Sequence, residues 1–348
     1  MASLYRVPRA WVDLGAGQMP VTSATWTRKA VRAADTFSVT LPIGTTRQYG
    51  FDYQQLADFQ PEDAMLYAAT QPGGGDQQLV MTGHIDTPEI DFDNQTVTIK
   101  GRDKSASLTT NRRSQKFLNQ SSTDIVSTIA QSRGLDVAFV GVQGMAGKVF
   151  SDFVHLTLNR SDYEIVSDLA EREGFRWYVD GSTLYFEPKG QQSGAYAFTY
   201  RPPVPGQSYG MADCWGLKAS RNKTAAAPTT VTVKSWNRKD KKLYKATKSV
   251  GGIGSDVVAE YHHNEKTQDQ VEKLAQSRLD NMIRHDCKAS WTAPGDLTLD
   301  VHEGASLTGT GTIYDQTYDI DDVTFSMAYS GEVFTMSLNC KTAVAGRS

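Results

Sequence analysis

The stretch SDYEIVSDLAEREGFRWYVDGSTLYFE, residues 161–187, predicts a helix, a strand, a tight turn and a second strand in direct succession. Ser161 followed by Glu164 is a capping box, in which each side chain binds a backbone N–H that the first helical turn leaves unpaired. Gly174 can take the left-handed conformation that ends the helix. After this glycine the apolar period changes from 3.6 residues to two, and Asp180-Gly181 supplies a two-residue hairpin turn. We therefore expect a capped amphipathic helix that runs into a β-hairpin.

The same pattern occurs about forty residues upstream. Residues 118–134 match residues 158–174 at eight of seventeen positions, including the serine of the cap and the closing glycine. The first copy also runs from its glycine into an alternating strand at 135–139. Such a repeat indicates a duplicated structural unit, and two copies are too few for a solenoid. Because every shared position serves as a cap, an apolar stripe or a stop, we interpret the repeat as a packing unit without chemistry.

The composition is that of a globular chain with room for two or three domains. With 348 residues, 22% charged residues and a net charge of −3, the chain carries no strong field for nucleic acid or a membrane. Its apolar runs are far shorter than the roughly twenty residues of a membrane span, and its first residues lack the apolar core of a signal peptide. We expect no membrane segment. Three widely spaced cysteines favour buried free thiols over disulfides or a zinc site: Cys214, Cys287 and Cys340.

Strand signals dominate both ends of the chain. Short alternating runs separated by Gly, Pro, Asp and Asn predict a first β-barrel-like domain at 1–103, which is nearly all strand. Residues 104–190 form an α+β segment with the two repeats, and 191–348 form a second β-barrel-like domain with an inserted helix at about 264–285. The predicted fold class is α+β, mainly β, with two small barrel-like domains flanking and connected by a helix-and-strand segment. Further strands are expected in the last domain at 290–293, 297–301, 323–329 and 333–339.

Histidines and acids with metal-binding potential occur at two places. His262-His263-x-Glu265 has suitable residue types, but adjacent residues of a strand point to opposite faces, so surface polarity at a helix start is the simpler interpretation. His84-x-Asp86 shares one face of a strand and fits an ion pair or half of a metal site. No third ligand is visible for the second pair, and we predict no metal site.

Nucleotide, calcium and zinc-protease motifs are also absent from the sequence. Gly147-Lys148 lacks the Walker spacing, and the dinucleotide fingerprint does not occur. Four aspartates resemble the acidity of a calcium loop without its spacing: Asp315, Asp319, Asp321 and Asp322. There is no H-E-x-x-H. We therefore predict no catalytic residue and no cofactor-binding residue.

The most basic stretch of the chain is NRKDKK at 237–242, with Lys245 and Lys248 beyond it. It follows an alternating run at 229–236 and is therefore expected to be the solvated end of a hairpin. The alternative is contact with an acidic partner surface or with a nucleic acid backbone passing nearby.

Four blocks in a fixed order resemble the baseplate hub proteins of contractile-tailed phages. They are GRDKS at 101–105, LNQSSTDIVSTIAQSRGL at 118–135, SDYEIVSDLAEREGFRWYVDGSTLYF at 161–186, and the helix DQVEKLAQSRLDNMI at 269–283 before the closing strands. The chain looks most like the hub of Mu-type phages, with the late control protein D family as relatives. The likeness covers nearly the whole chain.

The resemblance implies a structural protein without an active site that assembles as a homotrimer. In that family each chain carries two similar β-barrel domains, so that three chains offer six barrels and adapt a six-fold tail tube to a three-fold spike. The implied partners are the tail tube protein and the central spike protein, with transient contact to the tape measure or to DNA in the channel. The implied location is the tail baseplate of the virion, after assembly in the host bacterial cytoplasm.

Two other functions remain open at this point. An enzyme acting on cell-wall glycan or peptide would need paired carboxylates in a cleft. A soluble carbohydrate- or peptide-binding β module is supported only by aromatic-rich strands, which core packing explains equally well: Trp177, Tyr178 and Tyr185. Some phage hubs carry an added wall-cutting domain, and we expect none in this chain.

Overall fold

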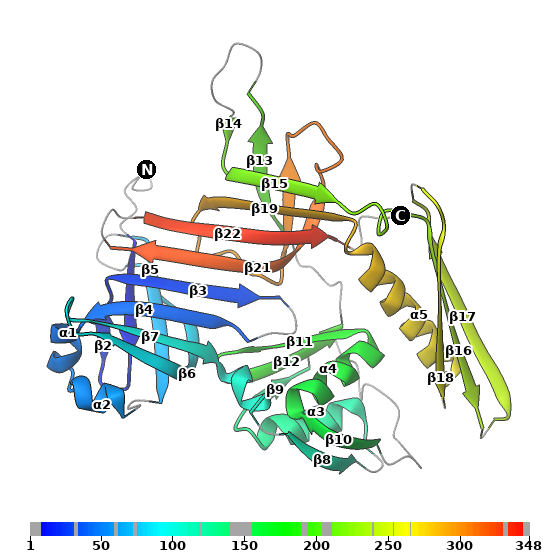
Figure 1. Cartoon of the computed structure of the whole chain (residues 1–348), viewed down its shortest axis with the longest axis horizontal. Helices are drawn as coiled ribbons and strands as arrows, with labels where there is room; N and C mark the ends of the chain where they lie inside the picture. Colours follow the sequence, from blue (N-terminus) through cyan, green and yellow to red (C-terminus); the bar gives the residue numbers. More distant parts are fainter. Residues whose placement is uncertain are drawn as a thin grey trace.

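Strands dominate the structure and helices are few (Figure 1). The computed structural model describes residues 8–30, 34–58, 62–71, 75–110, 112–117, 120–139, 155–188, 194–203, 211–238, 240–252, 254–264, 266–329 and 333–343. The predicted class, α+β with mainly β structure, is confirmed.

Fourteen of the described strands form one continuous sheet, in the order β14-β13-β20-β21-β3-β4-β7-β6-β5-β1-β2. A branch leaves β21 through β22 and β19 to β15. The strands from the first part of the chain are β1 (Arg9–Asp13), β2 (Gln18–Pro20), β3 (Ser23–Lys29), β4 (Thr36–Pro42), β5 (Asp63–Ala69), β6 (Gln78–Asp91) and β7 (Thr96–Asp103). Those from the last part are β13 (Ala195–Arg201), β14 (Met211–Ala212), β15 (Trp215–Arg221), β19 (Cys287–Pro294), β20 (Gly304–Thr308), β21 (Thr317–Ala328) and β22 (Val333–Thr342).

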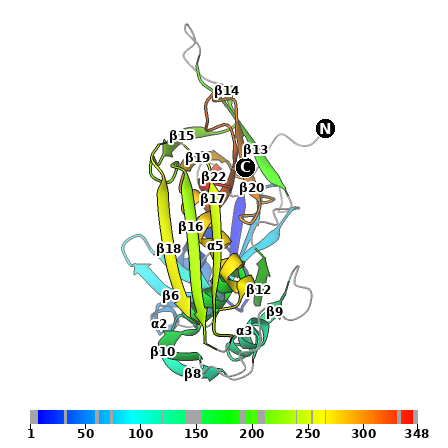
Figure 2. The ribbon, with the colours of Figure 1, turned by 90° about the vertical axis from the view of Figure 1, so that its right-hand side faces the viewer.

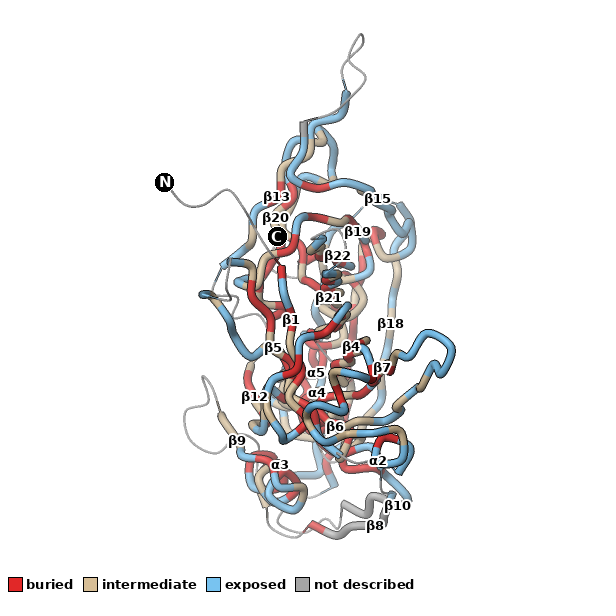
Figure 3. The backbone as a smooth tube through the Cα atoms, turned by 90° about the vertical axis from the view of Figure 1, so that its left-hand side faces the viewer, coloured by how far each residue is buried: buried red, intermediate tan, exposed pale blue. Residues whose placement is uncertain are grey.

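The two groups of strands meet at β3 and β21, which pair antiparallel from Ser23 opposite Ala328 to Lys29 opposite Asp322. Trp26 lies opposite Phe325 at this seam, and their stacked rings have centroids 5.1 Å apart. One hydrophobic core extends across the seam into both groups, and Figure 3 shows the buried segments concentrated inside the molecule. Because β3 uses one edge for β4 and the other for β21, the strand pairing in the described residues closes no barrel, and the predicted two-barrel arrangement is not confirmed.

Two short helices interrupt the first group of strands, contrary to the expectation of nearly continuous strand. They are α1 (Ile43–Gln48) and α2 (Tyr53–Ala57). Asp52 and Gln55 form a capping box that starts α2. The D-x-x-Q spacing of Asp52 and Gln55 is a signal for a helix start. No long apolar stripe follows it, so the sequence pattern did not predict a helix here.

The strand expected at 297–301 is also wrong, because turns occupy these residues. Asp296 accepts hydrogen bonds through Oδ1 from the backbone N and the Oγ1 of Thr298, at 2.9 and 2.8 Å. This local side-chain turn competes with strand pairing. The other three strands expected in the last region are confirmed within β19, β21 and β22.

The middle segment contains both predicted repeats, each with its capping box. Helix α3 (Ser122–Gln131) is capped by Ser121, helix α4 (Asp162–Glu173) is capped by Ser161, and Gly174 ends α4 with φ of 73°. The predicted hairpin follows α4 as β11 (Phe175–Asp180) and β12 (Thr183–Pro188), but its turn is Gly181-Ser182 and not Asp180-Gly181, because Asp180 already pairs with Thr183. The strand after α3, β9 (Asp136–Ala138), pairs parallel with β12. The strands before the helices, β8 (Arg112–Phe117) and β10 (His155–Ser161), pair antiparallel.

The two repeats therefore share one hydrophobic core rather than forming two units. Both apolar stripes and the inner face of the hairpin contribute to it, together with Leu108 and Phe117 before the first repeat. The buried residues from the second copy and its hairpin are Ile165, Val166, Leu169, Ala170, Trp177, Val179, Leu184 and Phe186.

A third unit lies at one end of the molecule's long axis (Figures 1 and 2). It consists of the sheet β17-β16-β18 and the helix α5 (Gln268–Ile283), which falls within the helix predicted at 264–285. Its strands are β16 (Thr229–Asn237), β17 (Lys242–Val250) and β18 (Val257–Asn264). Helix α5 packs on one face of this sheet and forms a core with it that is separate from the core of the large sheet.

The prediction for the cysteines is confirmed. All three cysteines are buried free thiols. Among the helices that the structure describes, none has both the length and the apolarity that a membrane span requires.

Candidate functional site

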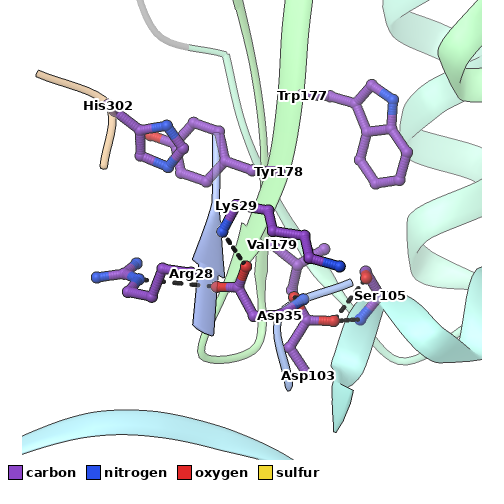
Figure 4. A pocket seen from close by; sticks show the side chains of 9 residues that line it. All are labelled: Arg28, Lys29, Asp35, Asp103, Ser105, Trp177, Tyr178, Val179 and His302. Carbon is purple, nitrogen blue, oxygen red and sulfur yellow. Dashed lines mark hydrogen bonds and ion pairs between the residues drawn. The ribbon is translucent and has the colours of Figure 1, made fainter. Parts of the chain in front are cut away.

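Three regions of the chain meet at a buried junction, shown in Figure 4. Asp35 comes from the connection between β3 and β4, Asp103 from the end of β7, Tyr178 from β11, and His302 from the turn before β20. Asp35 is 9% exposed, Asp103 6% and His302 9%. Charged and polar side chains this deeply buried require partners, so their contacts define what the junction does.

The two carboxylates of the junction are held by backbone groups. The N–H of Asp35 donates to Oδ2 of Asp103 at 3.1 Å, and the N–H of Asp103 donates to the carbonyl of Asp35 at 3.0 Å. The N–H of Lys29 donates to Oδ1 of Asp35 at 2.7 Å. Asp103 also caps the short helix η2 (Lys104–Leu108), accepting from the N–H and hydroxyl of Ser105 at 3.1 and 2.5 Å. The pair therefore ties the β3–β4 connection to the start of the middle segment.

Further contacts attach the hairpin β11–β12 to the large sheet. Arg28 on β3 places Nε 3.7 Å from Oδ2 of Asp35 and Nη2 3.3 Å from Oδ1 of Asp180, at the end of β11. The rings of Tyr178 and His302 stack with centroids 3.7 Å apart. The carbonyl of His302 accepts a hydrogen bond from Nη1 of Arg176 at 3.3 Å.

Burial changes the proton affinity of these groups. Burial first, and then the charge of Asp103, raise the pKa of Asp35 to about 7, against partial compensation by the Lys29 N–H and the Arg28 guanidinium. Burial also raises the pKa of Asp103. Burial lowers the pKa of His302 to about 3, so its imidazole is neutral over the physiological range.

The junction encloses a cavity of about 10 Å³, which has room for one water molecule and no more. Two acids with raised pKa values are a pattern typical of active sites, but a substrate must reach such acids. Here a sugar or peptide has no space beside Asp35 and Asp103. The arrangement can brace three regions against one another, and it can store a proton.

A larger open groove of about 490 Å³ lies along α4. It contains three acids, and each is paired with an arginine: Arg112–Glu164 at 3.0 Å, Arg160–Asp168 at 3.6 Å and Arg278–Glu171 at 2.9 Å. The backbone N–H of Ser161 and, less strongly, the Arg112 guanidinium lower the pKa of Glu164, so this carboxylate is held in its charged form. The Arg278–Glu171 pair joins α5 to α4 and so links the end unit to the middle segment.

The candidate histidine sites are dispersed in the structure. His84 pairs with Asp63 on the neighbouring strand, and Asp86 binds Arg102 at 2.6 and 2.8 Å. His262 lies on the open face of β18, 2.9 Å from Glu260. Three residues named with these motifs, Gly147, Lys148 and Glu265, lie outside the described residues.

The four aspartates near the end of the chain are each held by nearby donors of the protein. Asp315 accepts from the backbone of Thr310 and Gly311, at 2.9 and 2.8 Å. The other pairs are Asp319 with Arg284 at 3.4 Å, Asp321 with Lys341, and Asp322 with Asn339 at 2.8 Å. Within the part of the chain that the structure describes, no three metal-ligating side chains converge.

Sequence reasoning missed the junction itself. Asp103-x-Ser105 lies in the first block that carries the resemblance, and its spacing is the signature of a helix cap. Asp35 and His302 have no local signal, since their burial depends on strands from opposite ends of the chain.

The whole fold occurs in several phage tail proteins of low sequence identity. The tail protein of Neisseria meningitidis superposes with a TM-score of 0.72 at 13% identity, covering 96% of this chain and 96% of that one. The 43 kDa tail protein of prophage MuSo2 from Shewanella oneidensis gives a TM-score of 0.71 at 16% identity, covering 97% and 99%. An Escherichia coli component of the type VI secretion system gives 0.56 at 13% identity, covering 95% and 76%. At these identities the likeness establishes the fold.

The structure thus places the chain in a class of β-rich proteins shared by phage tails and a type VI secretion component. The phage tail baseplate hub (GPD) family matches residues 54–292, which is more than half of the sequence, and the chain belongs to this family. No curated protein matches the chain. The resemblance drawn from the four sequence blocks is confirmed, and with it a structural hub role in the tail baseplate of the virion.

Proposed function

We propose that three copies of the chain form a ring that joins the tail tube to the central spike. Membership of the baseplate hub family carries this proposal. It is supported by the division of the large sheet into an N-terminal and a C-terminal group of strands on either side of the β3–β21 seam. Three chains would then present six strand groups around the ring, which suits an adapter between six-fold and three-fold symmetry.

In this ring, residues 1–103 and 191–348 provide two barrel-like units, and 104–190 braces them. The contacts Arg28–Asp180 and Tyr178–His302 support the bracing role, because each joins the middle segment to a different group of strands. The ring encloses a channel through which DNA leaves, and the tape measure contacts its wall transiently. Assembly takes place in the host bacterial cytoplasm.

The test of this proposal is the mass and symmetry of the full-length protein. Sedimentation equilibrium of the protein alone should give a mass of about three chains, and with the purified spike protein it should give that mass plus the mass of the spike. Class averages by electron microscopy should show a three-fold ring with a central hole. A monomer at high micromolar concentration that binds neither spike nor tube protein would contradict the proposal.

The proposed ring has no hydrolytic activity of its own. Its support is the small volume of the cavity at Asp35 and Asp103, about 10 Å³, together with the arginine pairing of the acids in the α4 groove. Incubation with purified peptidoglycan should release no soluble fragments, with a lysozyme as the positive control. Release of fragments that persists after further purification would identify an enzyme instead.

A further inference from the structure

The two ends of the molecule's long axis carry opposite charge. Figure 1 places α2 near one end and the sheet β17-β16-β18 at the other. We call the first the acidic end and define it by four exposed aspartates of α2 and of the β6–β7 turn: Asp52, Asp58, Asp91 and Asp93. We call the second the basic end and define it by four exposed cations of the β16–β17 turn and of β17: Arg238, Lys241, Lys242 and Lys245.

The acidic end combines its charge with an exposed aromatic side chain. Phe92, at the β6–β7 turn, is 67% exposed, and its ring packs only against Tyr53 of α2 among the ring contacts of the described residues, at 5.0 Å. This contact brings α2 and the turn together into one surface. The Arg47 guanidinium covers Tyr53 at 4.8 Å and offsets part of the negative charge. Glu89 lies next to this surface but is already paired with Lys100 at 2.7 Å.

The basic end combines its charge with two exposed apolar side chains. Trp236 on β16 and Leu243 on β17 are direct cross-strand partners, 50% and 53% exposed, on the face opposite α5. Lys245 follows two residues later on the same face of β17. Asp240 is the one acid among the described residues of this turn, and it accepts a hydrogen bond from Tyr244 at 3.0 Å. Figure 2 shows the open face of this sheet with none of the other labelled helices and strands in front of it.

Each end alone would be an ordinary surface feature, but together they match. Exposed large apolar side chains rimmed by charge mark protein contact sites, because the apolar groups supply affinity and the charges supply orientation. A nucleic acid would be attracted to the basic end, yet it would leave the acidic end and the apolar pair without a role. A second copy of the chain satisfies both ends at once.

We propose that the basic end of one chain docks on the acidic end of the next copy, with Trp236 and Leu243 packing beside Phe92. The two surfaces differ, so the contact is heterologous, and repeating it by rotation closes a ring. The inference rests on the proposed ring of three and adds the surfaces that make its junctions.

Charge exchange tests the docking in the full-length chain. The first variant carries Lys242→Glu and Lys245→Glu, the second carries Asp58→Lys and Asp93→Lys, and the third carries all four changes. These positions are exposed, and the variants keep Asp52 and Asp91, which cap α2 and the β6–β7 turn. A control with Lys218→Glu and Lys288→Glu makes the same change of net charge on β15 and β19, away from both ends.

The expected readout is the dissociation constant of the ring by sedimentation velocity. Each of the first two variants should weaken assembly by at least about tenfold, since like charges then face each other at every junction. The third variant should recover most of the loss, and the control should assemble like the unchanged protein. Assembly of the unchanged protein should also weaken as the salt concentration rises from 50 to 500 mM. This measurement does not depend on whether a variant folds.

Some results would overturn the proposed docking of the two ends and leave the proposed ring of three chains valid. An unchanged protein that forms trimers, with first and second variants that are folded by circular dichroism and assemble normally, would place the junction elsewhere. A four-change variant as weak as the first two would exclude charge pairing between the ends. Binding of duplex DNA that needs Lys242 and Lys245, with assembly unaffected, would assign the basic end to nucleic acid. If the unchanged protein never assembles, the proposed function fails first.

Discussion

Replacing Asp35 by asparagine should stabilise the protein above neutral pH, although it removes a carboxylate that accepts a hydrogen bond from the Lys29 N–H and faces the Arg28 guanidinium. The pKa of Asp35 is raised from 3.8 to about 7 in the folded chain. Between these values the folded chain keeps a proton that the unfolded chain has released. The contribution of protonated Asp35 to the free energy of unfolding is therefore fully present below about pH 4 and is lost as the pH rises through about 7.

The size of the effect follows from the interval between the two pKa values. Each pH unit within it is worth about 1.4 kcal/mol for one group, so the interval from 3.8 to about 7 corresponds to at most about 4 kcal/mol. Asparagine keeps the shape and carries no charge. The free energy of unfolding of Asp35→Asn, relative to the unchanged protein, should rise by up to about 4 kcal/mol between pH 4 and pH 8.

His302 changes the free energy of unfolding with pH in the opposite direction to Asp35. The effect of Asp35 therefore has to be measured as the difference between the Asp35→Asn variant and the unchanged protein. Its pKa is lowered from 6.5 to about 3, so the unfolded chain binds a proton first as the pH falls. The stability from neutral His302 is complete above pH 6.5 and is lost towards pH 3. The two slopes oppose each other in the unchanged protein, and only the difference between the two proteins isolates Asp35.

Urea unfolding at several pH values measures the difference, followed by tryptophan fluorescence and by amide hydrogen exchange of β11. We expect stabilisation by Asp35→Asn at pH 8 and little change, or a loss, at pH 4 to 5. A variant that is destabilised equally at both pH values would refute the account of Asp35 as a buried acid that resists ionisation.

Three further substitutions test the parts of the fold that position the junction. Ser161→Ala removes the cap of α4 and should cost about 1 kcal/mol of unfolding free energy in urea, and an unchanged value would mean that the cap is dispensable. Trp26→Ala removes the ring stacked on Phe325 at the β3–β21 seam and should cost about 3–5 kcal/mol, with faster hydrogen exchange in both strands; exchange that speeds up in β3 alone would argue against a shared core. Gly101→Ala adds a methyl group that overlaps the carbonyl of His84 and should cost about 1–3 kcal/mol by thermal unfolding, where full tolerance would show that β6 and β7 can separate.

The parts of the fold that sequence predicts well are those fixed by neighbouring residues. Ser161, Glu164 and Gly174 set the start and the end of α4 within one segment, so the helix could be predicted residue by residue and the hairpin after it with its turn off by one residue. The basic turn between β16 and β17 was predictable for the same reason. In each case the deciding contacts span only a few residues.

The seam and the junction depend on contacts between distant residues. Trp26 and Phe325 alternate with polar neighbours as in any half-buried strand, and their spacing cannot show that they face each other. In the sequence Asp35 looks like any acid in a connection between two strands. It is buried only because β7, β11 and the turn at His302 surround it. The same limit explains why β18 could not be expected to pair parallel with β16.

The mass and symmetry of the assembled protein test the central claim most directly. Electron microscopy of the full-length chain mixed with its spike protein should show a ring of three chains around an open centre, seated on the spike. Single particles the size of one chain, with no ring at any concentration tried, would contradict the account of this protein as a baseplate hub that acts through assembly.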